Sequence, residues 1–333
     1  MRKLVNSHAT EVALLGVMLV IGMVLSLATD RFFTLGNLFD LLNTSAVNII
    51  FAVGLLVVLI SGGIDISFAV AASAVQYITA LALGWIGGGN WAIGLIIAGS
   101  IGILFGMFNA FFIHYFRIIS IVVTIATFNI YFGMLMFLTS GVSIYDLPDW
   151  LVTPVILFEH QSTDGTWSEI TLPTLIMLGC VIATWFLISR TTTGRQIIAF
   201  GDNPEGARRF GINIAAMQFI AFGWLGLMSG IAGLVQAHYV QEVVPNALYG
   251  RELDVLAAVV LGGARLGGGR GTVLGCVLGV LLISTTQNSL NLMGVSSYAF
   301  KMIIGAIILA AITLSNSGIE RLLPTLSKKG EAK

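Results

Sequence analysis

The chain has 333 residues, of which 57% are hydrophobic and only 10% are charged, and its 16 basic and 16 acidic residues cancel to a net charge of zero. So few charges cannot cover the surface of a soluble fold of this length, and the mean hydropathy of +0.96 is typical of a protein that crosses a membrane many times. The neutral balance argues against a nucleic acid as partner, and four His with two Cys exclude a His/Cys metal cage.

Apolar runs that are long enough to cross a bilayer recur along the whole sequence. A helix needs about 20 mostly apolar residues to cross the hydrocarbon layer. The runs cover residues 12–29, 42–60, 66–87, 91–114, 119–140, 172–190, 214–238, 252–263, 272–287 and 298–316. We therefore expect an all-α polytopic membrane protein with about ten transmembrane helices, forming a single domain over residues 1–333.

The positive charges predict the orientation of these helices. With a cytoplasmic N-terminus, thirteen of the 16 Lys and Arg residues fall on the cytoplasmic side, and only Arg31, Arg251 and Lys301 fall outside. Because cytoplasmic turns carry the excess of Lys and Arg, both termini are predicted to be cytoplasmic. A cleaved signal peptide over the first run is the less favoured alternative, because that run is longer than the apolar part of a signal peptide.

The segment 61–67, with the sequence SGGIDIS, separates the second and third runs without a proper polar loop. An Asp at membrane depth costs on the order of 2.5–3.5 kcal/mol and is usually buried against protein or placed beside a cavity. We expect a broken helix next to a transport pathway. The simpler alternative, which is compatible with it, is that Asp65 or Ser67 caps the helix that follows.

Polar side chains inside the predicted spans are mostly amides and hydroxyls rather than charges. Taken singly, each is typical of an interhelical hydrogen bond worth about 0.6 kcal/mol. Taken together, neutral donors and acceptors suit a pathway for a neutral polyhydroxylated solute. The candidate pathway residues are Asn48, Asp65, Ser67, Asn109, Thr124 and Asn288.

The longest predicted loop, residues 141–171, carries five acidic residues and no Lys or Arg. This composition places it outside the cell. The pair Asp164-Gly165 is a turn signal, so a small lid or hairpin is expected.

Residues 191–213 form the most informative cytoplasmic segment. Asn203 is a good N-cap, Pro204 suits the first helical position and Gly211 suits a left-handed stop. We predict a two-turn helix that lies along the membrane and docks into a cytoplasmic partner, the alternative being an interfacial anchor. The residues assigned to this docking segment are Gly194, Arg195, Asn203, Pro204, Glu205, Gly206, Ala207, Arg208, Arg209 and Gly211.

Two acids and a glycine-rich turn flank the eighth run. Glu252 and Asp254 at its outer start are typical of acids at the positive end of a helix, and substrate binding is the less favoured interpretation. Residues 261–271 lack the Gly-Lys pair of a phosphate-binding loop and instead indicate a tight re-entrant bend. Similar glycine–acid openings at 62–66 and 250–255 favour two inverted five-helix repeats, a pattern typical of transporters. The alternative is that glycines and acids gather at any helix entrance.

Several of these stretches together resemble the membrane permeases of ribose-type ABC importers. Residues 61–68 resemble a Gly-Gly-Ile-Asp-Leu-Ser element of that family, and 252–271 is the most similar stretch. The other matching stretches are 106–109 with 119–124, 193–212 and 288–295. The resemblance covers nearly the whole chain. It departs from the family pattern near Ser120, where the usual Pro is missing, and at Phe68, where Val is common.

The resemblance implies the pore subunit of an ATP-driven importer in the bacterial inner membrane, which moves a simple sugar or related polyol from periplasm to cytoplasm. It implies that 141–171 is a periplasmic loop and 191–213 a cytoplasmic coupling segment. The implied partners are cytoplasmic ATP-binding subunits, a periplasmic sugar-binding protein, a second permease copy (identical or paralogous) and membrane lipid. ATP hydrolysis would belong to the partner, so we expect no enzymatic activity, catalytic residue, metal or cofactor in this chain.

Two other functions stay open. A self-contained secondary transporter would carry a proton on Asp65, Glu252 or Asp254, and the docking-type helix argues against it. A permease of the same type could instead move another small polar solute, such as a nucleoside or a branched-chain amino acid. A membrane-embedded enzyme lacks support, because the sequence contains no His-Glu-x-x-His motif and no convincing nucleophile–base pair.

Overall fold

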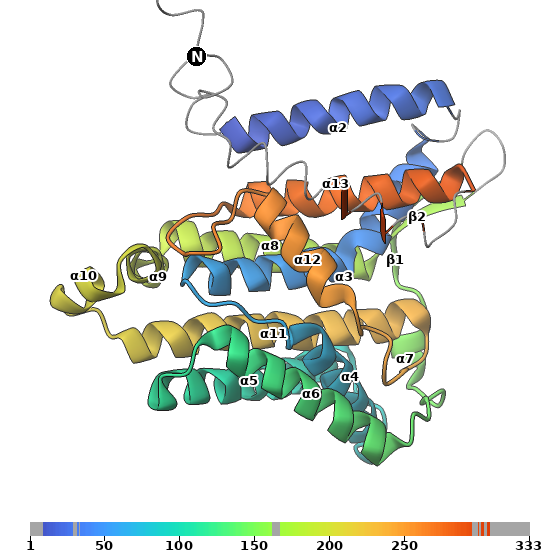
Figure 1. The fold of residues 1–333 in the computed structure, drawn as a ribbon. Helices are drawn as coiled ribbons and strands as arrows, with labels where there is room; N and C mark the ends of the chain where they lie inside the picture. Colours follow the sequence, from blue (N-terminus) through green and yellow to red (C-terminus); the bar gives the residue numbers. More distant parts are fainter. Residues whose placement is uncertain are drawn as a thin grey trace, which may run out of the picture.

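The computed structural model describes residues 9–28, 32, 34–161, 167–294, 299, 301–302 and 305–306. Within this part of the chain, seven helices are long and apolar enough to cross a membrane, and they pack into one bundle (Figure 1). They are α3 (Leu35–Ile60), α4 (Phe68–Trp85), α5 (Trp91–Phe116), α6 (Ser120–Thr139), α8 (Leu172–Arg190), α11 (Ile214–Val240) and α13 (Val273–Leu292).

Three of the ten predicted spans stand apart from these seven. The first forms α2 (Ala9–Ala28), a helix of 20 residues that packs beside α13. The eighth forms α12 (Arg251–Leu261), whose 11 residues measure only about 16 Å and cannot cross the hydrocarbon alone. The tenth, at 298–316, lies outside the described residues except for the few positions named above. The count of about ten therefore stays a prediction.

Polar side chains set the beginnings of several long helices. The side chains of Thr34, Asn90, Asn213 and Thr272 accept hydrogen bonds from backbone N–H groups in the first turns of α3, α5, α11 and α13. An oxygen acceptor at this position satisfies a donor that has no partner within the helix. These four residues therefore fix where each apolar run begins as a helix.

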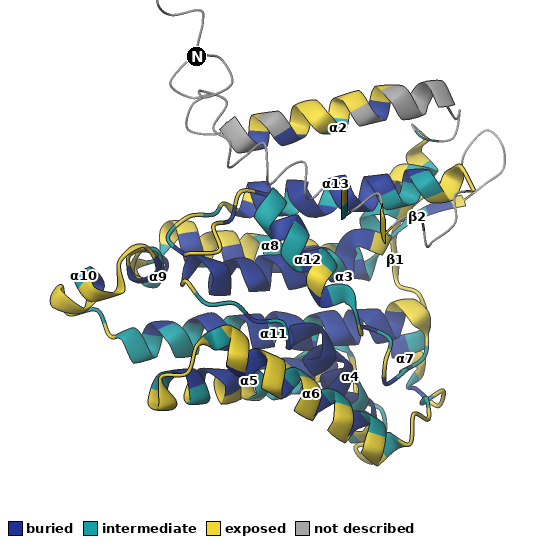
Figure 2. Cartoon of the chain, viewed as in Figure 1, coloured by how far each residue is buried: buried dark blue, intermediate teal, exposed yellow. Residues whose placement is uncertain are grey.

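The core of the bundle is the antiparallel pair α3 and α11 (Figures 1 and 2). In α3, 83% of the most apolar 18-residue window is buried, which leaves little of this helix to face lipid. Gly54 on α3 lies against Met228 on α11, and a methyl group at Gly54 would come within 2.7 Å of the Met228 Cβ. The pair is therefore packed through a small residue that lets the helices approach closely.

Each of the two core helices packs on two helices from the other half of the chain. Helix α11 packs on α4 and α5, whereas α3 packs on α12 and α13. The α5–α11 and α12–α13 contacts are both lined by glycines, with Gly102 and Gly226 in the first and Gly262 and Gly279 in the second.

The segment between α6 and α8 contains the predicted hairpin, which is the exception to an all-α fold within the described residues. A short helix, α7 (Asp149–Val152), precedes strands β1 (Ile156–Gln161) and β2 (Trp167–Thr171), which pair antiparallel. The predicted Asp164-Gly165 turn lies outside the described residues.

The hairpin is attached to the start of α3 by the amide of Asn43. Its Nδ2 donates to the Glu169 carbonyl at 2.8 Å, and its Oδ1 accepts from the hydroxyls of Thr171 at 3.0 Å and Thr174 at 2.6 Å. One side chain thus ties α3, β2 and the first turn of α8 together.

Candidate functional site

The predicted helix break is present between α3 and α4. Helix α3 ends at Ile60, α4 begins at Phe68, and the seven residues between them are not helical. Gly62 has φ +84°, a left-handed conformation that favours glycine. Within this segment Asp65 and Ser67 are buried, whereas Gly62 is exposed.

Three predicted pathway residues meet inside this break. Asp65 Oδ1 accepts hydrogen bonds from the Ser67 backbone N–H and from the Ser67 hydroxyl, both at 2.7 Å. Asn109 on α5 donates from Nδ2 to Asp65 Oδ2 at 3.1 Å and to Ser67 Oγ at 2.9 Å. All three residues are buried. The carboxylate thus holds the broken segment against α5, because its oxygens are the acceptors for both neighbours.

Helix α6 supports the break from the other side. The Ser120 hydroxyl accepts from the Ile64 N–H at 2.9 Å, and the Thr124 hydroxyl donates to the Ile64 carbonyl at 3.3 Å. The two backbone groups of Ile64 have no helical partner, so hydroxyls from α6 take that role. Thr124 therefore belongs to the same cluster as Asp65, with Ser120 as a member that the sequence interpretation did not select.

Asn48 and Asn288 lie on α3 and α13, which pack against each other. The side-chain Oδ1 atoms of both are buried and have no hydrogen-bond partner among the described residues. Asn109 Oδ1 is likewise buried without a hydrogen-bond partner among the described residues. Buried polar atoms are nearly always satisfied, so acceptors left open in this way are candidates for contact with water or a polar solute.

A polar stripe on α4 was not selected from the sequence. Ser73, Gln76 and Thr79 recur every three residues and are buried, and each has an oxygen without a hydrogen-bond partner in the described part of the chain. The Gln76 amide also donates to the Val244 carbonyl at 3.1 Å. The spacing of three was the available signal, because it places all three on one face of a helix.

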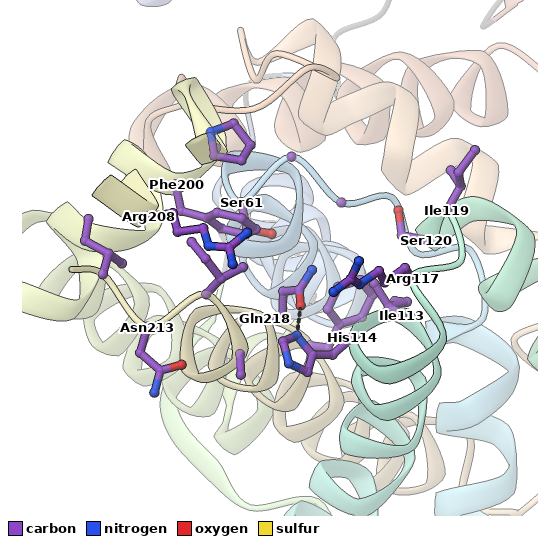
Figure 3. Close-up of a pocket in the computed structure, with 18 of the residues that line it drawn as sticks. Ser61, Ile113, His114, Arg117, Ile119, Ser120, Phe200, Arg208, Asn213 and Gln218 are labelled. Atoms are coloured by element: carbon purple, nitrogen blue, oxygen red, sulfur yellow. Dashed lines mark hydrogen bonds between the residues drawn. The ribbon is translucent and has the colours of Figure 1, made fainter. Parts of the chain in front are cut away.

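A cavity of about 840 Å³ lies at the end of the bundle near the 191–213 segment (Figure 3). Its lining includes Ser61 and Gly63 of the break, Arg117 after α5 and Arg208. His114 Nδ1 and Gln218 Oε1 lie 2.8 Å apart across the α5–α11 contact at one wall. The cavity thus opens an aqueous approach to the break from this end.

The predicted capped helix is present as α10 (Pro204–Arg209). The Asn203 side chain accepts from the Gly206 N–H at 2.9 Å, and Gly211 ends the helix at φ +79°. The Ile212 N–H bonds to the Ala207 carbonyl at 3.1 Å, which closes the C-terminal turn. The caps read from the sequence therefore form as predicted.

A second helix, α9 (Thr192–Asp202), precedes α10 and was not predicted. Gly194 is buried at the corner between α8 and α9, where a methyl group would overlap the Leu187 carbonyl oxygen. Ala207 is buried as well. Both residues pack against the chain itself, and their assignment to the docking segment stays a prediction.

Most of the other residues assigned to the docking segment are exposed. Arg195, Asn203, Pro204, Glu205, Arg208 and Arg209 are exposed, Gly206 is half-buried, and Phe210 is 91% exposed. Glu205 and Arg209 form an ion pair at 3.4 Å. The exposed Phe210 and its charged neighbours are compatible with the predicted docking surface and with the alternative of an interfacial anchor.

The two acids at the start of α12 differ in burial. Glu252 is buried, and its carboxylate oxygens accept from the Gly250 N–H at 3.0 and 3.2 Å, so it caps its own helix. Asp254 is half-buried.

The glycine-rich segment between α12 and α13 is not helical, and Gly263, Gly268, Gly269 and Gly271 have positive φ there. The expected bend at 261–271 is therefore present.

Comparison with known proteins identifies membrane permeases as relatives of this chain. The family model of the branched-chain amino acid transport system / permease component matches residues 37–312. The chain is 31% identical over 307 residues to the ribose import permease protein RbsC of Escherichia coli (strain K12), covering 90% of this chain and 91% of the relative. It is 32% identical over 297 residues to RbsC of Bacillus subtilis (strain 168), covering 89% of each chain. It is 28% identical over 312 residues to the autoinducer 2 import system permease protein LsrC of Photorhabdus luminescens, covering 94% of this chain and 91% of the relative. No solved structure matches the chain.

Proposed function

The chain belongs to the family of the branched-chain amino acid transport system / permease component, and from that membership we propose that it is the transmembrane pore subunit of an ATP-driven importer for a simple sugar or related polyol. The observation that carries this proposal is the similarity to two ribose import permeases over about nine-tenths of the chain. The polar groups of the interior fit such a cargo, because amides and hydroxyls exchange hydrogen bonds with sugar hydroxyls.

The proposed complex contains cytoplasmic ATP-binding subunits, a periplasmic solute-binding protein and a second permease copy in the lipid bilayer. The exposed, capped α10 with Phe210 supports docking of an ATP-binding subunit at this surface. ATP hydrolysis is assigned to that subunit. The permease then contributes the passage and the movement that opens it.

In this proposal, the end that carries α9 and α10 faces the cytoplasm, both termini lie on that side, and the β1–β2 hairpin faces the periplasm. The division of Lys and Arg residues supports this orientation. The cavity beside Ser61 and Arg208 then forms the cytoplasmic exit. Sugar released by the binding protein would move from the hairpin end towards this cavity.

We propose that the two halves are inverted repeats in which α3, α4 and α5 correspond to α11, α12 and α13. The contacts support this, since α11 packs on α4 and α5 while α3 packs on α12 and α13. The non-helical segment before α4, residues 61–67, then corresponds to the non-helical segment before α12, residues 241–250. Broken helices at matched positions of inverted repeats are typical of substrate pathways.

The decisive experiment reconstitutes the permease in proteoliposomes with its ATP-binding subunits and binding protein. Uptake of radiolabelled ribose should require both partners and ATP, and competition by other sugars, a nucleoside or leucine would define the class of cargo. Uptake by the permease alone under a proton gradient would contradict the proposal and favour secondary transport. If leucine or a nucleoside competes and sugars do not, the sugar assignment fails while the ATP-driven mechanism stands.

A further inference from the structure

Three backbone segments from distant parts of the chain meet at Gly201, near the end of α9. The first is the end of α3, whose last residue is Ile60, and the second is the bend between α12 and α13 at Gly268 and Gly269. The Gly269 N–H donates a hydrogen bond of 2.9 Å to the Ile60 carbonyl. A methyl group at Gly201 would overlap that same carbonyl oxygen. One peptide oxygen therefore contacts both the docking segment and the bend at 261–271, which we call the second helix break.

Backbone atoms make most of this contact, and the Cβ of Asp202 adds to it. A methyl group at Gly201 would also lie 2.8 Å from the Gly269 nitrogen, and one at Gly268 would lie 2.9 Å from the Gly201 Cα. A methyl group at Gly269 would lie 2.7 Å from the Asp202 Cβ. Because backbone atoms have no rotamers to absorb a displacement, such a contact transmits movement with little slack. We call Ile60, Gly201, Gly268 and Gly269 the glycine junction.

The glycine junction touches both breaks at once. The residues that follow Ile60 form the break before α4, and Gly268 and Gly269 belong to the bend after α12. Ser61, Gly201 and Gly267 all line the cavity of Figure 3. A displacement of α9 therefore acts on two walls of the cavity, one from each half of the chain.

We propose that Gly201 is a positioning residue that transmits movement of α9 and α10 directly to both helix breaks, so that the two halves respond together. This inference rests on the proposed function, since it requires an ATP-binding subunit that moves α10. Gly201 lies in the last turn of α9, three residues before α10 begins at Pro204, so a movement of α10 reaches the glycine junction over a short stretch of chain. The fold supplies this link without any side chain that must change its conformation.

The direct test is Gly201→Ala in the assembled complex. The added methyl group pushes α9 away from the Ile60 carbonyl while α10 stays unchanged. The complex should retain its ATP-binding subunits and continue to hydrolyse ATP, but ATP-driven uptake should fall by about tenfold, in the range of coupling effects. The matched control is Gly179→Ala on α8, where no heavy atom of the described residues outside that helix's own backbone lies within 4 Å of the new methyl group. Equal uptake by Gly201→Ala and wild type would overturn the inference.

A second measurement leaves the glycine junction intact, so it does not depend on how well the alanine variant folds. Spin labels at Asp202→Cys and Arg270→Cys flank the junction. A second pair uses Arg117→Cys, which lines the cavity, and Leu266→Cys, which precedes the lining residue Gly267; all four positions are exposed. Binding of a non-hydrolysable ATP analogue to the complex should change the 117–266 distance and leave the 202–270 distance unchanged. If the 202–270 pair separates, the junction is not a rigid link and the inference fails.

The proposed function and the role of Gly201 are contradicted by different results. If the wild-type complex shows no uptake that depends on ATP and the binding protein, the proposed function is wrong. If the wild-type complex transports and the Gly201→Ala complex transports equally well, only the inference about Gly201 is wrong.

Discussion

Gly102 on α5 and Gly226 on α11 face each other so closely that a methyl group added to either one would overlap the carbonyl oxygen of the other. The contact continues one turn away on each side, where Gly106 meets the Phe222 carbonyl and Gly230 meets the Ala98 carbonyl. In a bilayer, two helices gain little from excluding lipid, so close approach of small residues is a main source of association. The α5–α11 contact is therefore stabilised by glycines, whose lack of a side chain lets the two helices approach closely.

The α5–α11 contact predicts that an alanine substitution destabilises the protein at Gly226 but not at a glycine outside the contact. Gly226→Ala should force α5 and α11 apart and lower the free energy of unfolding by about 1–3 kcal/mol, as overpacking does. Gly133→Ala on α6 is the control, because no heavy atom of the described residues outside its own helix backbone lies within 4 Å of the new methyl group. Thermal unfolding of the two purified variants in detergent should show a lower Tm for Gly226→Ala only. Equal Tm values would mean that α5 and α11 separate without cost.

The Asp65 cluster predicts a second stability effect. Asn109→Leu removes the donor to Asp65 Oδ2 and to Ser67 Oγ, which leaves buried acceptors unsatisfied and should cost about 1–3 kcal/mol. Asn129→Leu is the matched control, since Asn129 is exposed on α6 and its amide bonds to the Ile125 carbonyl of its own helix. Denaturation monitored by tryptophan fluorescence would separate the two. A comparable loss in both variants would show that the cluster does not hold the break.

The proposed orientation predicts which positions can be labelled from the periplasm. Glu159→Cys on β1 and Glu205→Cys on α10 are both exposed, whereas the native Cys180 and Cys276 are buried. A membrane-impermeant maleimide added to intact spheroplasts should label position 159 and spare position 205. Permeabilised cells should show labelling at both positions. The opposite pattern in intact spheroplasts would invert the topology.

The docking surface predicts a charge-dependent contact with the ATP-binding subunit. Arg208→Glu reverses an exposed charge next to Phe210 and should weaken co-purification of that subunit by about tenfold. Arg208→Lys keeps the charge and is the control. Gly206 is less suitable for this test, because a side chain there would meet the Asn203 cap at 3.1 Å. Full retention of the subunit by Arg208→Glu would reduce α10 to an interfacial anchor.

The attachment of the hairpin to α3 predicts a local change in dynamics. Asn43→Ala removes the hydrogen bonds to β2 and to the first turn of α8 and should cost the hairpin about 1–3 kcal/mol. Thr44→Ala is the control, since its hydroxyl bonds to carbonyls of its own helix. Hydrogen exchange of residues 167–171 should accelerate in Asn43→Ala alone. Unchanged exchange would assign the hold on the hairpin to other contacts.

Features that depend on local chemistry could be predicted from the sequence. The break at 61–67 follows from a carboxylate at membrane depth, and α10 follows from its two caps. The hairpin follows from a polar loop with a turn signal. In each case the residues that create the feature lie within a few positions of it.

Features that depend on distant contacts could not be predicted. Helix α9 was missed because Gly194 and Gly201 disfavour a helix in isolation, and they are there because neighbouring backbone leaves no space for a side chain. An apolar run also does not reveal how much of it forms one continuous helix, and α12 has only 11 residues. The pairing of Asp65 with Asn109 joins residues 44 positions apart, which no local pattern reveals.

That separation has a consequence for how the protein is made. A chain is synthesised from its N-terminus at about 5–20 residues per second, so Asp65 emerges from the ribosome roughly 2–9 s before Asn109. During that interval Ser67 is the only other side chain of the cluster that has been synthesised, so the carboxylate has only its hydrogen bonds with Ser67. The helix break therefore matures only after α5 and α6 arrive, which makes the order of helix insertion part of how the pore is assembled.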